Sequence, residues 1–516
     1  MIIKLTMLAV FFAVMIYIGF YCRKHATNVN GFVLGGRNVG PWLTAFAYGT
    51  SYFSAVIFIG YAGQFGWKYG LASTWIGIGN ALIGSMLAWV ILGRRTRIMT
   101  QHLGSATMPE FFGKRFDSKA LKIGASIIVF VFLIPYTASL YNGLSRLFGM
   151  AFDIDYTVCI IIMAVLTGIY VIVGGYMATA INDFIQGIIM LVGIVAIIGA
   201  ILNSNGGFME AIGGLAAVQD PVASTQPGVF ASFFGPDPIN LLGVVILTSL
   251  GTWGLPQMVQ KFYAIKSEKA ISKGTIISTA FALVVAGGCY FLGGFGRLYS
   301  DGVAVSPTGA IVFDSIIPLM LTDLGDVLMG LVVVLVLSAS MSTLSALVMT
   351  SSSTLTLDFL KGNFIKNMSE KKQILCIRIL IVIFIGISVV IAVAQYRNSN
   401  IFIAQLMGVS WGALAGSFLA PFLYGLYWKR VTKAAVWASF IFGSGLMVAN
   451  LFFGKYFPAA LASPINAGAF AMIAGLVIVP VVSCLTRKPD KNQIEQIFAG
   501  YEKKVEVPQK EDLGEG

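Results

Sequence analysis

The chain has 516 residues, of which 57% are hydrophobic and 11% are charged, and its mean hydropathy is +0.85. This composition lies far outside that of soluble domains and indicates a protein that crosses the membrane many times. Two histidines and five scattered cysteines without a CxxC pair give no sign of a zinc site, a disulfide framework or a membrane enzyme. The formal net charge of +12 follows from membrane topology and needs no nucleic-acid partner.

Thirteen segments are long and apolar enough to cross roughly 30 Å of hydrocarbon. They cover residues 2–22, 42–64, 71–93, 123–148, 156–179, 184–203, 239–260, 275–296, 324–355, 376–394, 401–427, 434–453 and 465–485. The first segment has no small-residue cleavage site after it, so we expect a retained helix and not a signal peptide. The fold class predicted is therefore an all-α membrane protein with about 13 transmembrane helices.

Basic residues are distributed unevenly between alternate loops. If the N-terminus lies outside, 28 of the 34 Lys and Arg residues fall on the cytoplasmic side and the other six on the outer side. This asymmetry is what the positive-inside rule requires. We therefore expect a multi-pass protein of the plasma (inner) membrane with an external N-terminus and a cytoplasmic, solvated C-terminal tail.

Two segments contain helix-breaking residues in mid-span. Residues 42–64 read "TAFAYGTSYFSAVIFIG" around the glycine and hydroxyl residues 49–54, and residues 239–260 contain Gly251, Gly254 and Pro256. Unwound backbone at membrane depth is tolerated where it lines a cavity, and in transporters it binds ions and substrates. The two breaks lie five helices apart, which favours an inverted repeat, although close helix packing would also use these small residues.

A third segment, "LSASMSTLSALVMTSSSTL", is rich in hydroxyl side chains. Ala339, Ser342 and Thr343 are spaced i, i+3, i+4 and share one helix face, with Ser345 on its margin. Neutral hydroxyls together with backbone carbonyls suit a hard monovalent cation, whereas clustered carboxylates would suit calcium. The alternative is that these hydroxyls bond back to their own helix, which we expect for the later run 350–356.

Asp183, in "GGYMATAINDFIQG", is an acidic residue close to the membrane interior. It is expected to cap a helix that begins at residue 184, where a negative charge meets the helix dipole. The alternative is a place on an ion path, because acidic residues at membrane depth often mark such paths.

Several of these stretches together resemble the sodium:solute symporter family, which includes bacterial pantothenate and proline permeases and the sodium–glucose transporters. The resemblance spans roughly residues 30–430. It is carried by "GRNVGPWLTAFAYGTSYFSAVIFIG", "MPEFFGKRF", "VGGYMATAINDFIQG", "GLPQMVQKF" and "SASMSTLSALVMTSSS". It implies a leucine-transporter-type fold with a 5+5 inverted repeat, broken helices 2 and 7, and alternating access.

The resemblance also implies the ligands of a bound sodium ion (Na+). These are the backbone oxygens of Thr50, Phe53 and Ala339 and the hydroxyls of Ser342 and Thr343. Some members of the family bind a second sodium through additional hydroxyls and the aspartate between helices 5 and 6. Ser345 and Asp183 match that pattern as a second sodium or ion exit position. However, Ala346 replaces a further serine, so we expect one sodium per cycle.

The substrate is less well defined by the sequence. Proline permeases have an aspartate where this chain has Tyr52, whereas pantothenate permeases share a pattern like "YFSA", and sugar is disfavoured because residues 71–84 offer only Asn80. The expected pocket consists of Tyr52, Ala55, Tyr136, Trp253, Pro256 and Gln257. Each aromatic residue has helix packing as its alternative role.

The function predicted is sodium-coupled symport of a small carboxylate-bearing nutrient into the cell, pantothenate-like first and proline or another small carboxylate second. A proton-coupled transporter of the same fold and a gated channel are the alternatives. The partners expected are the small-molecule substrate and the lipid bilayer. The organisation predicted is an N-terminal helix and cytoplasmic loop (1–40), a first repeat (41–203), an extracellular loop (204–238), a second repeat (239–427), two further helices (428–485) and a cytoplasmic tail (486–516).

Overall fold

The computed structural model describes residues 2–152, 155–220, 226–305, 309, 311–361, 363–365, 367–397 and 403–502, and these residues form helices joined by loops. Apolar residues run through nearly every segment, so the main chain satisfies its hydrogen bonds within helices. The α-helices are α1 (Ile2–Cys22), α2 (Val29–Leu34), α3 (Pro41–Tyr52), α4 (Ala62–Tyr69), α5 (Thr74–Gly79), α6 (Arg94–His102), α7 (Met108–Arg115), α8 (Lys119–Phe152), α9 (Tyr156–Ser204), α10 (Phe208–Ala217), α11 (Pro238–Gly254), α12 (Pro256–Ala264), α13 (Glu268–Gly293), α14 (Ile316–Met320), α15 (Asp326–Thr354), α16 (Glu370–Arg397), α17 (Ile403–Tyr427), α18 (Lys433–Phe453), α19 (Ala459–Ala462), α20 (Pro464–Leu485) and α21 (Lys491–Phe498).

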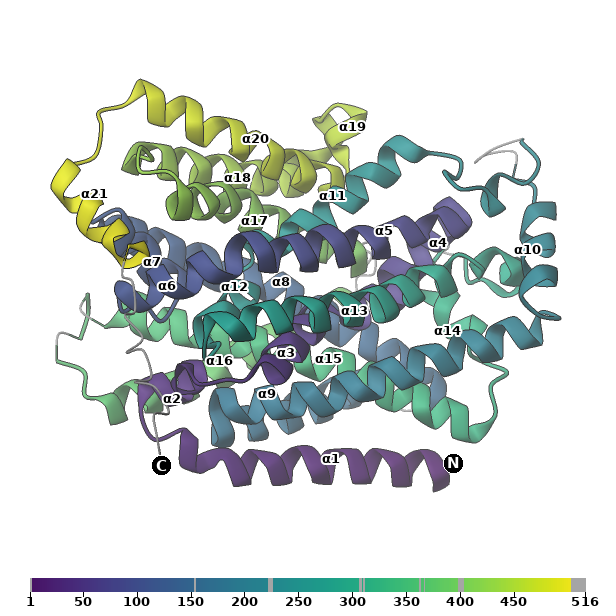
Figure 1. Cartoon of the computed structure of the whole chain (residues 1–516). Coiled ribbons are helices and arrows are strands. Elements are labelled where there is room, and N and C mark those ends of the chain that lie inside the picture. The colour runs from purple at the N-terminus through teal and green to yellow at the C-terminus, as the bar shows by residue number, and fades with distance from the viewer. Residues whose placement is uncertain are drawn as a thin grey trace, which may run out of the picture.

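The long helices lie side by side and run in one general direction between the two ends of the molecule (Figure 1). Within the described residues, ten helices are long and apolar enough to cross a membrane, or eleven if the bent pair α11 and α12 is one span. α15 and α17 are the most enclosed of these spans, so the core of the protein lies around them. The prediction of an all-α membrane protein is confirmed.

Two of these helical stretches are far longer than one bilayer crossing. Val56–His102 has 47 residues and Tyr156–Ser204 has 49, against about 20 for one crossing. Gly70 (φ 62°) and Gly175 (φ 59°, ψ −156°) interrupt them with backbone conformations that residues with a side chain rarely adopt. Each stretch therefore consists of two helices that meet at a glycine.

The break at Gly175 corrects one expectation from the sequence. The sixth segment was expected to begin at residue 184 behind an acidic cap, but the helix after the break already includes Asp183 in its interior. Asp183 is therefore not a cap. The glycine pair Gly174–Gly175 ends the preceding helix, and its backbone lies against α1 and α2, where Gly19 and Phe32 leave no room for a side chain.

Both segments with mid-span breaking residues are discontinuous in the structure. α3 ends at Tyr52, and Phe53 has an extended backbone (φ −90°, ψ 123°) before a π-helical stretch, Val56–Tyr61, leads into α4. α11 ends at Gly254, Leu255 is extended, and α12 begins at Pro256 after a bend of 46°. Helix ends leave carbonyl and amide groups without intrahelical partners, so each break presents free backbone groups in the protein interior.

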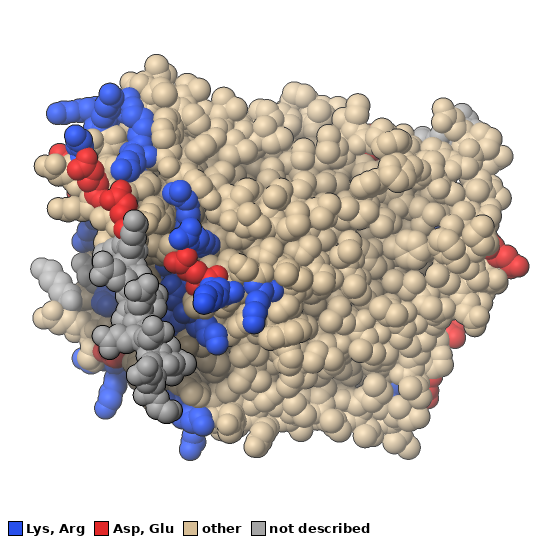
Figure 2. All heavy atoms as spheres, viewed as in Figure 1, with Lys and Arg blue, Asp and Glu red and all other residues tan. Residues whose placement is uncertain are grey.

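Lys and Arg side chains gather at one end of the molecule, around α6, α7 and α21 (Figure 2). Residues 491–501 pack against this end. The α21 residues Ile494, Ile497 and Phe498 are buried, and the Tyr501 hydroxyl donates to the carbonyls of Arg95 and Leu426, each at 3.2 Å. The expectation of a wholly solvated tail was therefore wrong for residues 491–501.

Candidate functional site

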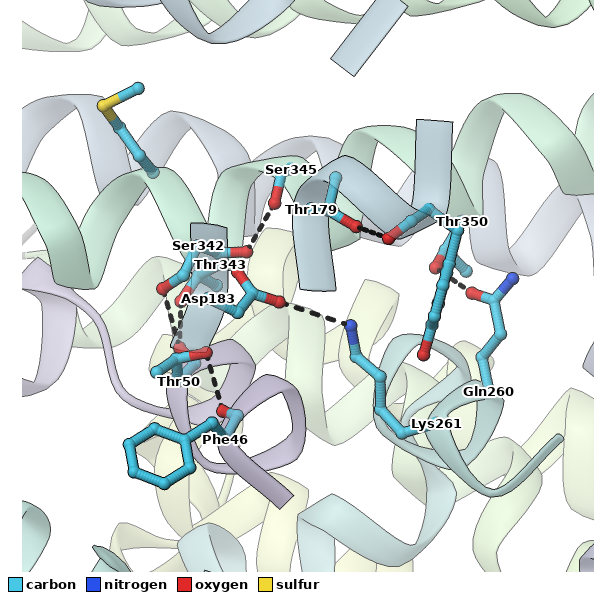
Figure 3. Close-up of polar contacts among 12 residues, drawn as sticks. Phe46, Thr50, Thr179, Asp183, Gln260, Lys261, Ser342, Thr343, Ser345 and Thr350 are labelled. Carbon is cyan, nitrogen blue, oxygen red and sulfur yellow. Dashed lines mark hydrogen bonds and ion pairs between the residues drawn. The ribbon is translucent and has the colours of Figure 1, made fainter. Parts of the chain in front are cut away.

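The five oxygen atoms predicted to bind sodium come together between the break in α3 and the middle of α15. The Ser342 hydroxyl lies 3.1 Å from the carbonyls of Thr50 and Ala339. The Thr343 hydroxyl lies 3.1 Å from the same two carbonyls and 3.2 Å from that of Phe53. All five residues are buried. Figure 3 shows the two hydroxyls directed at Thr50 from the neighbouring helix.

The helix break explains why these carbonyls are available. Thr50 lies in the last turn of α3, and Phe53 lies just beyond its end, so neither carbonyl continues a regular α-helical ladder. The Thr50 hydroxyl is already used, because it donates to the Phe46 carbonyl at 2.8 Å. Its backbone oxygen is therefore the group that faces α15.

The five oxygens have too few protons to satisfy one another by hydrogen bonds alone. Five oxygen–oxygen contacts of 3.1 to 3.2 Å share only the two protons of Ser342 and Thr343, because each hydroxyl donates one. The remaining contacts bring oxygen lone pairs together, and a cation in their midst would turn that repulsion into attraction. Neutral oxygens suit a hard monovalent ion, and no group of three or more His, Cys, Asp or Glu side chains placed for a metal occurs among the described residues.

Asp183 lies opposite Lys261 of α12. The carboxylate oxygen and the ammonium nitrogen are 3.8 Å apart, and both side chains are at most 3% exposed. Lys261 was not identified from the sequence, because the seventh segment was taken to end at residue 260. The signal was present, since a lysine five residues after Pro256 has to lie on the half-helix that follows the break. In the view of Figure 3, Asp183 lies between the Ser342–Thr343 pair and Lys261.

The other hydroxyls of α15 make different contacts. Ser345 donates to the Ser342 carbonyl at 2.9 Å, one turn back along its own helix. Thr350 was expected to bond back in the same way, but its hydroxyl donates instead to Gln260 of α12 at 2.8 Å, so that expectation was wrong. Ser353 does follow the expectation, with its hydroxyl 3.2 Å from the Thr350 carbonyl. α12 is thus linked to α15 by one hydrogen bond and to α9 by one ion pair.

The aromatic residues of the predicted pocket meet around Trp411 of α17. The Tyr52 ring lies 5.7 Å from that of Trp411, and the Tyr136 ring lies 5.9 Å from it in an edge-on arrangement. Ala55 is close by, since a Cβ atom on Gly143 of α8 would lie 3.1 Å from the Ala55 methyl group. These residues surround the first helix break.

The second helix break supplies the remaining residues of the predicted pocket. Trp253 is held in place because its indole nitrogen donates to the Ile83 carbonyl at 2.9 Å. Pro256 is in the first turn of α12, where a missing backbone N–H costs nothing. Gln257 is 1% exposed, and neither its amide oxygen nor its amide nitrogen has a hydrogen-bond partner among the described residues. A buried amide without partners is expensive, and both amide atoms of Gln257 are free to bond to a ligand in this pocket.

Comparisons with known proteins show the family of the chain. The model of the sodium:solute symporter family matches residues 32–443. Sodium/proline symporters of Staphylococcus aureus strains JH9, COL and N315 are each 32% identical over 515 residues, covering 95% of this chain and 95% of theirs.

Solved structures show the fold. A substrate-bound, outward-open Na+-coupled sialic acid symporter superposes with a TM-score of 0.76 at 17% identity, over 95% of this chain and 98% of that one. The inward-facing Mhp1 transporter gives 0.50 at 12% identity, over 89% and 94%. The architecture is therefore of the leucine-transporter type. The chain belongs to the sodium:solute symporter family and is a sodium-coupled, multi-pass membrane symporter.

Proposed function

We propose that the chain takes up a small carboxylate-bearing nutrient by alternating access, with one sodium ion bound at the carbonyls of Thr50, Phe53 and Ala339 and the hydroxyls of Ser342 and Thr343. The observation that carries this proposal is the convergence of five buried oxygens that share only two hydroxyl protons. A sodium ion there would join the break in α3 to α15. Sodium binding would thereby favour one arrangement of the helices over another.

The stoichiometry of one sodium per cycle is supported by the Asp183–Lys261 pair. A second sodium at Ser345 and Asp183 would need the carboxylate as its charged ligand. Lys261 already supplies a positive charge 3.8 Å from that carboxylate. Two cations competing for one buried carboxylate repel each other, so the bound lysine disfavours a second ion.

For the substrate, two observations point to different carboxylates. The curated relatives that we compared are sodium/proline symporters, which favours proline. Tyr52 stands where proline permeases have an aspartate, which favours pantothenate. Both compounds carry a carboxylate, and the free backbone amides and the N-terminal dipole of α12 suit a negative group in the pocket beside Gln257.

The direction of transport follows from the uneven charge. The basic end around α6, α7 and α21 would face the cytoplasm, which places the N-terminus outside. One positive charge that moves inward then gains about 2.3 kcal/mol per 100 mV of membrane potential. The sodium gradient adds to this driving force.

The test is uptake into proteoliposomes that contain the purified chain. Labelled pantothenate, proline and short carboxylates are supplied with an inward sodium gradient, with an equal proton gradient, or with neither. Accumulation of one carboxylate that requires sodium and saturates is the expected result. Accumulation driven by protons alone would establish the proton-coupled alternative, and flux that does not saturate would establish a channel.

A further inference from the structure

A cavity of about 490 Å³ opens where the outer halves of both broken helices end, at the end of the molecule opposite the basic residues. Its walls come from the end of α4, the start of α11 and the start of α20. Its polar lining consists of Lys68, Tyr69, Asp237, Asn240, Arg297, Ser463 and Asn466. The volume lies within the range of sites that enclose small ligands.

Two opposite charges face this cavity without meeting. Lys68 forms no ion pair with any described residue, and its ammonium group rests over the Phe313 ring at 5.5 Å. Among the described residues, Asp237 accepts hydrogen bonds only from the backbone and side chain of Asn240, at 3.1 and 2.6 Å. The charge of Asp237 acts on Lys68 through the intervening space. A ligand with one charge of each sign could pair with Lys68 and with Asp237 at the same time.

Arg297 lines the cavity, but its charge is already paired, unlike that of Lys68. Its guanidinium lies between the rings of Phe230 and Trp67, donates to the Trp67 carbonyl at 2.6 Å, and pairs with Asp220 at 2.9 Å. This network fixes the end of α4. The Lys68 side chain, one residue after Trp67, is thereby held at the edge of the cavity.

The cavity is lined by residues of the same helices that lead to the two helix breaks. On α11, Asn240 and Val244 line the cavity, and the next residue on the same face is Thr248, whose hydroxyl donates to the Val244 carbonyl at 2.9 Å. On the other wall, Phe65 and Tyr69 line the cavity, and the Phe65 ring also contacts that of Tyr61, at 4.9 Å. The cavity therefore lies along the same two helices, α4 and α11, that lead to the two breaks.

We propose that this cavity is an outer loading site for zwitterionic substrates, in which Lys68 binds the carboxylate of an amino or imino acid and Asp237 binds its ammonium group. The inference rests on the proposed function and narrows its substrate class. A carboxylate without an ammonium group would use only half of the site. None of the six residues assigned to the pocket around Tyr52 and Gln257 is acidic, so the loading site would supply the preference for the zwitterion.

Four variants test this inference through sodium-driven uptake of labelled proline and labelled pantothenate. Lys68→Gln and Asp237→Asn remove the two charges, and asparagine keeps the cap of α11 because it accepts the same backbone hydrogen bond. Lys455→Gln and Asp301→Asn are the matched controls, since both residues are exposed, belong to neither the cavity nor the pocket, and follow helices that end on the same side. The sodium concentration for half-maximal uptake is measured for each variant.

We expect the proline concentration for half-maximal uptake to rise about tenfold in Lys68→Gln and in Asp237→Asn, because each loses one charge-assisted contact. The controls should change less than twofold, and the sodium dependence at saturating proline should stay constant. Pantothenate, which has no ammonium group, should respond to Lys68→Gln and not to Asp237→Asn.

Equal shifts in all four variants, or none, would overturn the loading site. A response of pantothenate to Asp237→Asn would overturn the zwitterion assignment. If neither compound shows sodium-driven uptake in the unmodified chain, both substrate candidates fail and the inference fails with them, whereas the proposed function fails only if no other small carboxylate is taken up.

Discussion

Replacing Thr343 by valine is the most direct test of the proposed sodium site. Valine has nearly the same shape as threonine, so the change removes one hydroxyl and leaves the packing of α15 intact. That hydroxyl lies within 3.2 Å of three carbonyls, those of Thr50, Phe53 and Ala339, so it is the most connected of the five oxygens. Loss of a contact to a charged group costs about 1.5 to 3 kcal/mol. The sodium concentration for half-maximal uptake should therefore rise roughly ten- to a hundredfold.

The assay is sodium titration of uptake in proteoliposomes at saturating substrate, corrected for the amount of protein. Thr343→Ser keeps the hydroxyl and should stay within about threefold of the unmodified chain. Ser353→Ala is the control for losing a buried hydroxyl, because among the described residues Ser353 bonds only to the Thr350 carbonyl of its own helix. Even hydrogen bonds between helices in membranes average only about 0.6 kcal/mol. If Thr343→Val and Ser353→Ala give the same titration, the oxygens at the break are packing contacts and the proposed site is wrong.

Three further predictions concern the rest of the molecule. Asp183→Asn or Lys261→Met alone should lower the stability of the protein in detergent by about 3 to 5 kcal/mol, because a buried ion pair loses one partner. The double variant should recover most of this loss. A double variant no more stable than either single variant would show that the two charges are not coupled. Phe498→Ala should release α21, because the Phe498 ring lies 4.9 Å from the buried guanidinium of Arg115. Hydrogen exchange over residues 491–498 should then accelerate at least tenfold, and unchanged exchange would refute a docked tail. On a cysteine-free background, Asp301→Cys should react with an impermeant maleimide in intact cells and Ser369→Cys only after permeabilisation; the reverse pattern would invert the proposed orientation.

The arrangement around the proposed sodium site could be predicted because its two parts are local patterns. The i, i+3, i+4 spacing of Ala339, Ser342 and Thr343 depends only on helix geometry. The break near Phe53 depends on a short run of glycine and hydroxyl residues. Which helices face each other cannot be read from either pattern. That step came from the resemblance to the family, and the structure brings the named oxygens within hydrogen-bond distance.

The parts that the sequence did not predict depend on long-range contacts. Asp183 looked like a cap because a polar pair preceded an apolar run, but the backbone turns eight residues earlier, at Gly175. Lys261 looked like the start of a cytoplasmic loop, since nothing local shows that its charge is matched from α9. The tail residue Phe498 could not be placed for the same reason, because its partner Arg115 is the last residue of α7, far away in the sequence. Burial there lowers the pKa of Arg115 to about 10, so the guanidinium remains charged at neutral pH.

The Asp183–Lys261 pair also has a consequence for how the chain is made. During synthesis the helix with Asp183 enters the bilayer before α12 exists. A lone aspartate costs up to about 2.5 to 3.5 kcal/mol on insertion, the value for the centre of a helix. Translation proceeds at about 5 to 20 residues per second, so the carboxylate remains without its lysine for several seconds. The early helices are therefore committed to the membrane in a metastable state. The early helices can take up their final packing only after α12 has been made. The time between the synthesis of Asp183 and that of Lys261 is therefore a stage at which quality-control proteases can recognise an unfinished chain.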